Sequence, residues 1–185
     1  MIRKILLLSV LLFAFSSVGI KSQNKKEELV PIKIELPKAM FVGTPTNLAV
    51  PNLEKPLGKP RAPFLAPKGT YNVAKNKPVS ATDDMPIIGE LNYLTDGKKA
   101  ATEGNFVELG PFTQNATIDL QKEYTIYAIV LWHYHLQARV YYDVIVQVAD
   151  DAKFTKNVRT LFNNDIDNSS KQGKGSDMQD RKSVV

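Results

Sequence analysis

The chain after Gly69 predicts an all-β fold in which two antiparallel sheets pack together as a β-sandwich. Short runs rich in β-branched and aromatic residues alternate with turn residues, and no stretch has the periodicity of an amphipathic helix. The run from Ile126 to Leu131 is apolar at every position, as expected of a central strand covered on both faces. The run ATIDL alternates like a strand with one wet face, so an antiparallel sandwich fits both runs.

Six strands are expected from this pattern. They are Tyr71–Ala74, Phe106–Leu109, Thr117–Leu120, Ile126–Tyr134, Tyr142–Ala149 and Val158–Phe162. The stretch SSKQGKGSD, residues 169–177, is expected to be a polar loop.

The N-terminus has the pattern of a secretory signal. Arg3 and Lys4 precede an almost wholly apolar run from Ile5 to Ile20, which is short for a membrane span. We therefore predict a signal peptide over residues 1–22 and a secreted, periplasmic or cell-surface protein without a membrane span after cleavage. An uncleaved anchor is the alternative. Because the chain has no cysteine, disulfides are excluded and any metal ligands must be oxygen or imidazole.

Residues 23–69 are rich in proline and lysine. Eight of the eleven prolines fall between Pro31 and Pro67. Proline fixes φ and disfavours helix at the preceding residue, so this stretch is expected to be an extended linker or a strap along the domain. A Pro-rich peptide ligand is the alternative interpretation.

The charge distribution argues against a nucleic-acid partner. The net charge is +5, but residues 1–69 hold eleven Lys and Arg against four Glu, a balance of +7. Residues 70–175 hold eleven basic against thirteen acidic residues, a balance of −2. The predicted domain therefore lacks the basic face that nucleic-acid binding requires.

Four motifs in order resemble the discoidin, or coagulation-factor type C, family. They are NVAKNKPVSAT at Asn72–Thr82, LTDGK at Leu94–Lys98, TIDLQKEYTIYAIVL at Thr117–Leu131 and VIVQVADD at Val144–Asp151. The resemblance covers Tyr71–Phe162 and implies a galactose-binding-like jelly roll over residues 70–179. It departs from the family pattern at Gln121, where glycine is usual, and at Ala149, where serine is usual.

The resemblance also implies a ligand site on the loops at one end of the jelly roll. His133, Tyr134, His135 and Arg139 follow the strand that starts near Ile126 and offer the imidazole, guanidinium and aromatic groups that hold sugars. In the alternative interpretation, Trp132 fills the core, the histidines bond to backbone, and Arg139 pairs with Asp143 or Glu108.

Metal ions enter the interpretation in two ways. His133 and His135 lie on one face of a strand and could hold a catalytic metal with Asp143, although no carboxylate motif supports such a site. The family resemblance implies a structural calcium near the T-D-G turn, with Asp96 and Thr102 among its ligands. The adjacent carboxylates of Asp150 and Asp151 are expected to form a turn, because a hydrolytic pair must face each other across a gap.

The end of the chain departs from the family pattern, which continues for several more strands. The residues DRKSVV, Asp180–Val185, are what a common sequencing adapter encodes, so residues 180–185 are interpreted as an artefact and the domain as truncated. The overall expectation is an exported, non-catalytic module of a longer protein that binds a glycan or cell-surface polysaccharide. The alternatives are a structural or protein-interaction sandwich beside a neighbouring catalytic domain, and a metal-dependent enzyme using His133 and His135.

Overall fold

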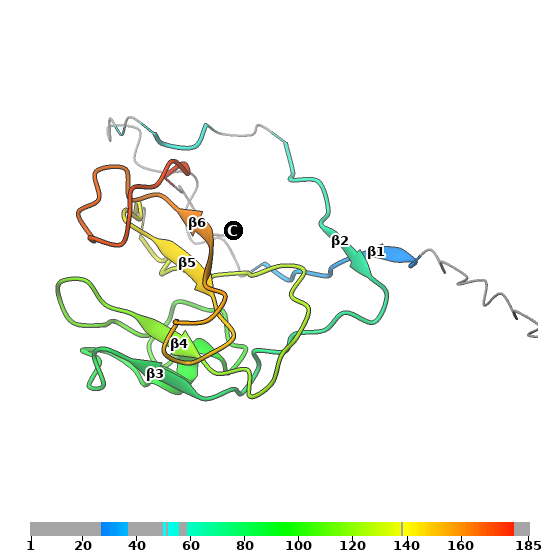
Figure 1. Ribbon diagram of the computed structural model, residues 1–185, viewed down its shortest axis with the longest axis horizontal. Coiled ribbons are helices and arrows are strands. Elements are labelled where there is room, and N and C mark those ends of the chain that lie inside the picture. The colour runs from blue at the N-terminus through cyan, green and yellow to red at the C-terminus, as the bar shows by residue number, and fades with distance from the viewer. Residues whose placement is uncertain (1–26, 37–49, 51, 56–58, 138, 180–185) are drawn as a thin grey trace, which may run out of the picture.

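The computed structural model describes residues 27–36, 50, 52–55, 59–137 and 139–179 (Figure 1). The predicted signal peptide, residues 1–22, and the predicted adapter residues 180–185 lie outside this range. Regular secondary structure within it consists of short β-strands and one 3-10 turn, which confirms the all-β class. A search of the same residues finds no helix of the length and apolarity needed to cross a membrane.

Six strands form three antiparallel pairs (Figure 1). The pairs are β1 (Leu29–Pro31) with β2 (Leu65–Pro67), β3 (Val79–Ala81) with β4 (Ala116–Ile118), and β5 (Ile145–Val148) with β6 (Arg159–Asn163); the 3-10 turn η1 spans Leu91–Leu94. Since each sheet has two strands, the closed sandwich stays a prediction.

Three of the predicted strands coincide with observed ones. Strands β4, β5 and β6 overlap the segments predicted at Thr117–Leu120, Tyr142–Ala149 and Val158–Phe162. β5 and β6 have a register shift between Val146 and Gln147, which a one-residue bulge explains.

Three other predicted strands are wrong. Tyr71–Ala74 is a turn, because the Asn72 side chain accepts a hydrogen bond from the Ala74 amide at 2.9 Å. Phe106–Leu109 contributes only an isolated bridge between Glu108 and Ile88. Ile126–Tyr134 forms no ladder with any described residue, although it has the strongest strand pattern in the chain.

The proline-rich stretch contains a strand pair that the sequence analysis did not predict. β1 and β2 are extended by bonds from the Ile32 amide to the Phe64 carbonyl and from the Lys68 amide to the Glu28 carbonyl, both 2.8 Å. Pro31 and Pro67 are tolerated there because each pair has open edges, where a missing N–H donor breaks no ladder.

The buried side chains of the described residues are mostly polar. Ala66 and Ala101 are the buried apolar residues, whereas Thr95, Asn164, Asp165 and Gln179 are buried polar ones. Asn164 exchanges two bonds with Val144, donates to the Tyr141 carbonyl and accepts from the Gln179 side chain. This polar centre connects the start of β5 to the segments that follow β6, and Gln179 Oε1 is the buried side-chain atom in it that has no hydrogen-bond partner among the described residues.

Candidate functional site

The segment from Trp132 to Tyr141 folds back on itself through two aromatic rings. The imidazole of His133 stacks on the phenol ring of Tyr141, with the centroids 4.0 Å apart and the planes 12° from parallel. The Tyr141 hydroxyl donates to the Tyr134 carbonyl at 2.8 Å. One side chain thus holds the two adjacent residues His133 and Tyr134 through different contacts.

The ring of Tyr134 is bounded by a cation and by a second aromatic ring. The guanidinium carbon of Arg139 lies 4.6 Å from the Tyr134 centroid, and Phe106 approaches edge-on with a centroid distance of 4.8 Å. Arg139 is exposed, and its Nη2 donates to Gln137 at 3.2 Å. A guanidinium carries five N–H donors, so Arg139 retains donors that face water.

His135 contacts the backbone rather than a ring. Its Nδ1 lies 3.1 Å from the His133 carbonyl oxygen. A carbonyl can only accept, so this contact assigns the proton to Nδ1 and leaves Nε2 as an acceptor in the neutral ring. The alternative in which histidines bond to backbone therefore describes His135.

Burial controls the protonation of this cluster. Desolvation lowers the pKa of His133 to about 4, so its imidazole is neutral at pH 7. Burial also raises the pKa of the Tyr141 hydroxyl, against the opposing effect of the nearby Arg139. Arg139 is therefore the positive charge within this group of rings.

Trp132 lies near Glu35, which follows β1, and does not fill a core. It is half-buried, and the Lys99 ammonium lies 5.7 Å from its ring centroid. The same ammonium donates to the Glu35 carbonyl at 3.0 Å. Lys99 therefore connects Glu35, which follows β1, to Trp132, which directly precedes His133.

The structure brings the four predicted ligand residues together. The group is His133, Tyr134, His135 and Arg139, to which it adds Tyr141 and Phe106. Sequence reasoning missed Tyr141; its position two residues after Arg139 is the signal that was available.

Comparisons with known proteins give no match to this chain, whether with family models, curated proteins or solved structures.

Asp96 forms the predicted local turn. Its Oδ1 accepts from the Lys98 amide at 2.8 Å, and the Lys98 ammonium lies 3.8 Å from Oδ2. Gly97 has φ of +88°, which the predicted T-D-G turn requires. The Thr102 hydroxyl accepts from Asn105. The calcium site expected at Asp96 and Thr102 stays a prediction.

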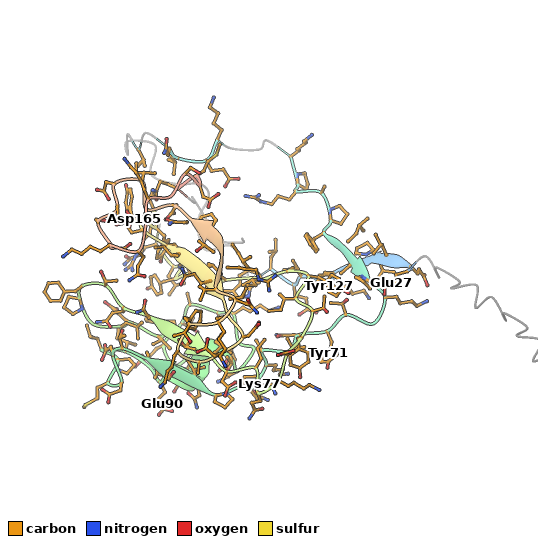
Figure 2. All side chains as sticks on the ribbon, viewed as in Figure 1. Glu27, Tyr71, Lys77, Glu90, Tyr127 and Asp165 are labelled. Atoms are coloured by element: carbon orange, nitrogen blue, oxygen red, sulfur yellow. The ribbon has the colours of Figure 1, made fainter. Side chains whose placement is uncertain are left out.

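Three aspartates come together beside the β5–β6 pair: Asp143 precedes β5, whereas Asp165 and Asp167 follow β6. Figure 2 shows Asp165 well away from Tyr127. Carboxylate oxygens of Asp143, Asp165 and Asp167 lie within 4.8 Å of one another. Neither histidine belongs to this group, the one such cluster among the described residues. Asp165 accepts from Ser169 and Ser170, and the Ser170 hydroxyl holds the pKa of that carboxyl below its usual value. These bonds order the predicted polar loop.

Asp150 and Asp151 form the expected turn. Asp151 Oδ1 accepts from the amides of Thr155 and Lys156 at 2.8 and 2.7 Å, while Asp150 accepts from Asn157. The Lys156 amide is the main cause of the lowered pKa of the Asp151 carboxyl. Both carboxylates therefore stabilise the connection between β5 and β6.

Proposed function

We propose that this protein is an exported, non-catalytic module that binds carbohydrate at the cluster around Tyr134 and Arg139. The observation that carries the proposal is the exposed guanidinium of Arg139 over the Tyr134 ring. The cluster combines fixed N–H donors, a ring-nitrogen acceptor and apolar ring surface within one short segment.

The chemistry of these groups matches that of a sugar. Guanidinium N–H groups donate to hydroxyl oxygens, and Nε2 of His135 accepts from a hydroxyl. The ring edges of Tyr134 and Phe106 offer an apolar surface for the C–H face of a pyranose. His133 is neutral at pH 7 and Arg139 carries a positive charge, so the site suits neutral or weakly acidic glycans.

The resemblance to the discoidin family supports the finer parts of the proposal. It implies the jelly-roll sandwich as the proposed fold and a ligand site on the loop that follows the run starting at Ile126. The charged and apolar start of the chain supports export. A structural calcium near Asp96 and Thr102 stays part of the proposal as the family resemblance implies it, apart from the sugar-binding groups.

A glycan array probed with the full chain tests this function. Arg139→Ala should abolish binding to the glycans that the wild type selects, because it removes the exposed donors. Arg159→Ala is the matched control, since Arg159 is an exposed arginine on β6 outside the cluster. Equal glycan binding by both variants, or no glycan binding by the wild type, would contradict the proposal.

A protein-interaction role is the second candidate, favoured by exposed apolar side chains next to β1 and β2. Leu29, Phe64 and Leu65 are 56%, 49% and 51% exposed. Apolar side chains gathered on one strand pair are typical of an interaction surface. Leu29→Ser with Leu65→Ser should then weaken protein association and leave glycan binding unchanged, whereas Arg139→Ala should do the reverse.

A further inference from the structure

Two extended segments of the described chain lie outside the three strand pairs. The first is the apolar run, defined as Ile126–Leu131. Its amides and carbonyls make no hydrogen bond to any described residue. Ile126 is 39% exposed and Tyr127 is 42% exposed. An uncharged run of β-branched and aromatic residues has the composition of a strand, and within the described residues this run has no neighbouring strand.

The second segment is the strap, defined as Ile32–Leu36, which continues from β1. Ile32 and Ile34 are half-buried, whereas Lys33 and Glu35 are exposed, so the strap alternates as a strand does. Backbone groups of Glu28 and Ile32 bond to the β2 side. Because successive residues of an extended chain direct these groups to opposite edges, Lys33 and Glu35 present theirs to the edge away from β2.

Lys99 contacts both the strap and the residue that follows the apolar run. Its ammonium donates to the Glu35 carbonyl and lies over the ring of Trp132, the residue that follows the apolar run. At the other end, Tyr127 lies toward β1 and β2 (Figure 2). The strap leaves β1 (Figure 1) and reaches Lys99 at Glu35, while the run starts near Tyr127 and is followed by Trp132 at Lys99, so the two segments extend in the same direction.

We propose that the strap is the strand partner of the apolar run. In this arrangement, which we call closed, the edge of the strap at Lys33 and Glu35 forms a parallel ladder with Ile126–Leu131. Lys99 stabilises the ladder at the end next to Trp132. Closure covers Ile126 and Tyr127 and fixes the residue directly before His133. The strap is the proposed partner because Lys99 contacts both Glu35 in the strap and Trp132, the residue directly after the run.

Disulfide trapping in the full chain tests the closed arrangement directly, because the natural sequence has no cysteine. Glu35→Cys is paired with Val130→Cys in one variant and with Leu131→Cys in another, which samples both faces of the run. Glu35→Cys with Phe112→Cys is the control, since Phe112 is 96% exposed and lies outside the run. Closure predicts that at least one test pair forms an intramolecular disulfide several-fold faster than the control.

Two other results of the trapping would overturn the proposal. Test pairs that oxidise no faster than the control would mean that the two segments do not meet. Disulfide-linked dimers as the main product would mean that the run pairs with a second copy of the chain instead.

Hydrogen exchange gives a readout that does not depend on introduced cysteines. Glu35→Pro removes an N–H from the proposed ladder, whereas the matched Ile34→Pro removes one from the opposite edge. Glu35→Pro should speed exchange of the Ile126–Leu131 amides by about 10-fold or more relative to Ile34→Pro. Equal exchange in the two variants would overturn the proposed register.

Discussion

The imidazole of His133 lies flat on the ring of Tyr141, 4.0 Å between centroids, while the hydroxyl of the same tyrosine bonds to the carbonyl of the next residue, Tyr134. One side chain therefore orients both the neutral histidine and the ring that carries Arg139. The geometry of the candidate sugar site depends on this contact, and the predictions below begin with it.

Tyr141→Phe should loosen the site without removing the stacked ring. The substitution deletes the hydroxyl that donates to the Tyr134 carbonyl and costs about 1 kcal/mol of the free energy of unfolding. Tyr142→Phe is the matched control, because Tyr142 is 50% exposed. Urea unfolding of both variants measures the difference; equal midpoints would show that the Tyr141 hydroxyl does not stabilise the segment.

His133 should make the stability depend on pH between 6.5 and about 4. Its pKa is lowered in the folded chain, so the unfolded chain binds the proton more readily across this interval. Stability is complete above pH 6.5 and is lost as the pH falls toward 4, by on the order of 2 kcal/mol once solvent screening at a half-buried group is allowed for.

Urea unfolding at pH 7 and pH 4.5 checks this dependence. His133→Gln should reduce the acid loss, while His135→Gln, which removes the other imidazole of the chain, should retain it. An acid loss of the same size in the wild type and in His133→Gln would contradict the assignment.

Asn164→Ala should be among the most destabilising single substitutions in the described part of the chain. It removes the bonds that the fully buried side chain makes to the Val144 amide and the Tyr141 carbonyl. Leaving those groups unpaired costs about 1 to 3 kcal/mol each. Thermal unfolding should show a large drop in Tm for Asn164→Ala and little change for Asn115→Ala, an exposed asparagine. Similar drops for both would refute the role of the polar centre.

Asp151→Ala should open the turn between β5 and β6. Asp151 accepts three hydrogen bonds from Thr155 and Lys156, and its lowered pKa means that this stabilisation is present at neutral pH and lost as acid protonates the carboxyl. Amide exchange at Thr155 and Lys156 should therefore accelerate in Asp151→Ala at pH 7. Asp150→Ala, which leaves these bonds intact, should not accelerate it at those two amides.

The sequence predicted the parts of the fold that depend on local chemistry. β4, β5 and β6 and the Asp151 turn were predictable, because alternating β-branched residues and a side chain that bonds its own turn act within a few residues. β1 and β2 were not, because their partners lie more than thirty positions apart and prolines disguise the strand pattern. Ile126–Leu131 was predicted to belong to a strand and forms none among the described residues, since strand propensity alone does not show which segment it pairs with.

The candidate site was predictable in its members and not in its geometry. The residues WHYHLQAR show which groups are near in sequence, and the family resemblance implies a ligand role for four of them. Nothing in that pattern shows that Tyr141 returns to stack on His133 or that Arg139 covers Tyr134. Both contacts depend on where Arg139 and Tyr141 lie relative to His133 and Tyr134, which residue identities alone do not specify.

The most direct test of the proposed function uses Trp132, the single tryptophan, which lies next to His133. A glycan selected on the array is titrated into the wild type, Arg139→Ala and Arg159→Ala, and Trp132 fluorescence is followed. A saturable change in the wild type and in Arg159→Ala, with affinity reduced about 10-fold or more in Arg139→Ala, is the expected result. Glycan binding that leaves Trp132 fluorescence unchanged and has equal affinity in all three proteins would contradict a sugar site at this cluster.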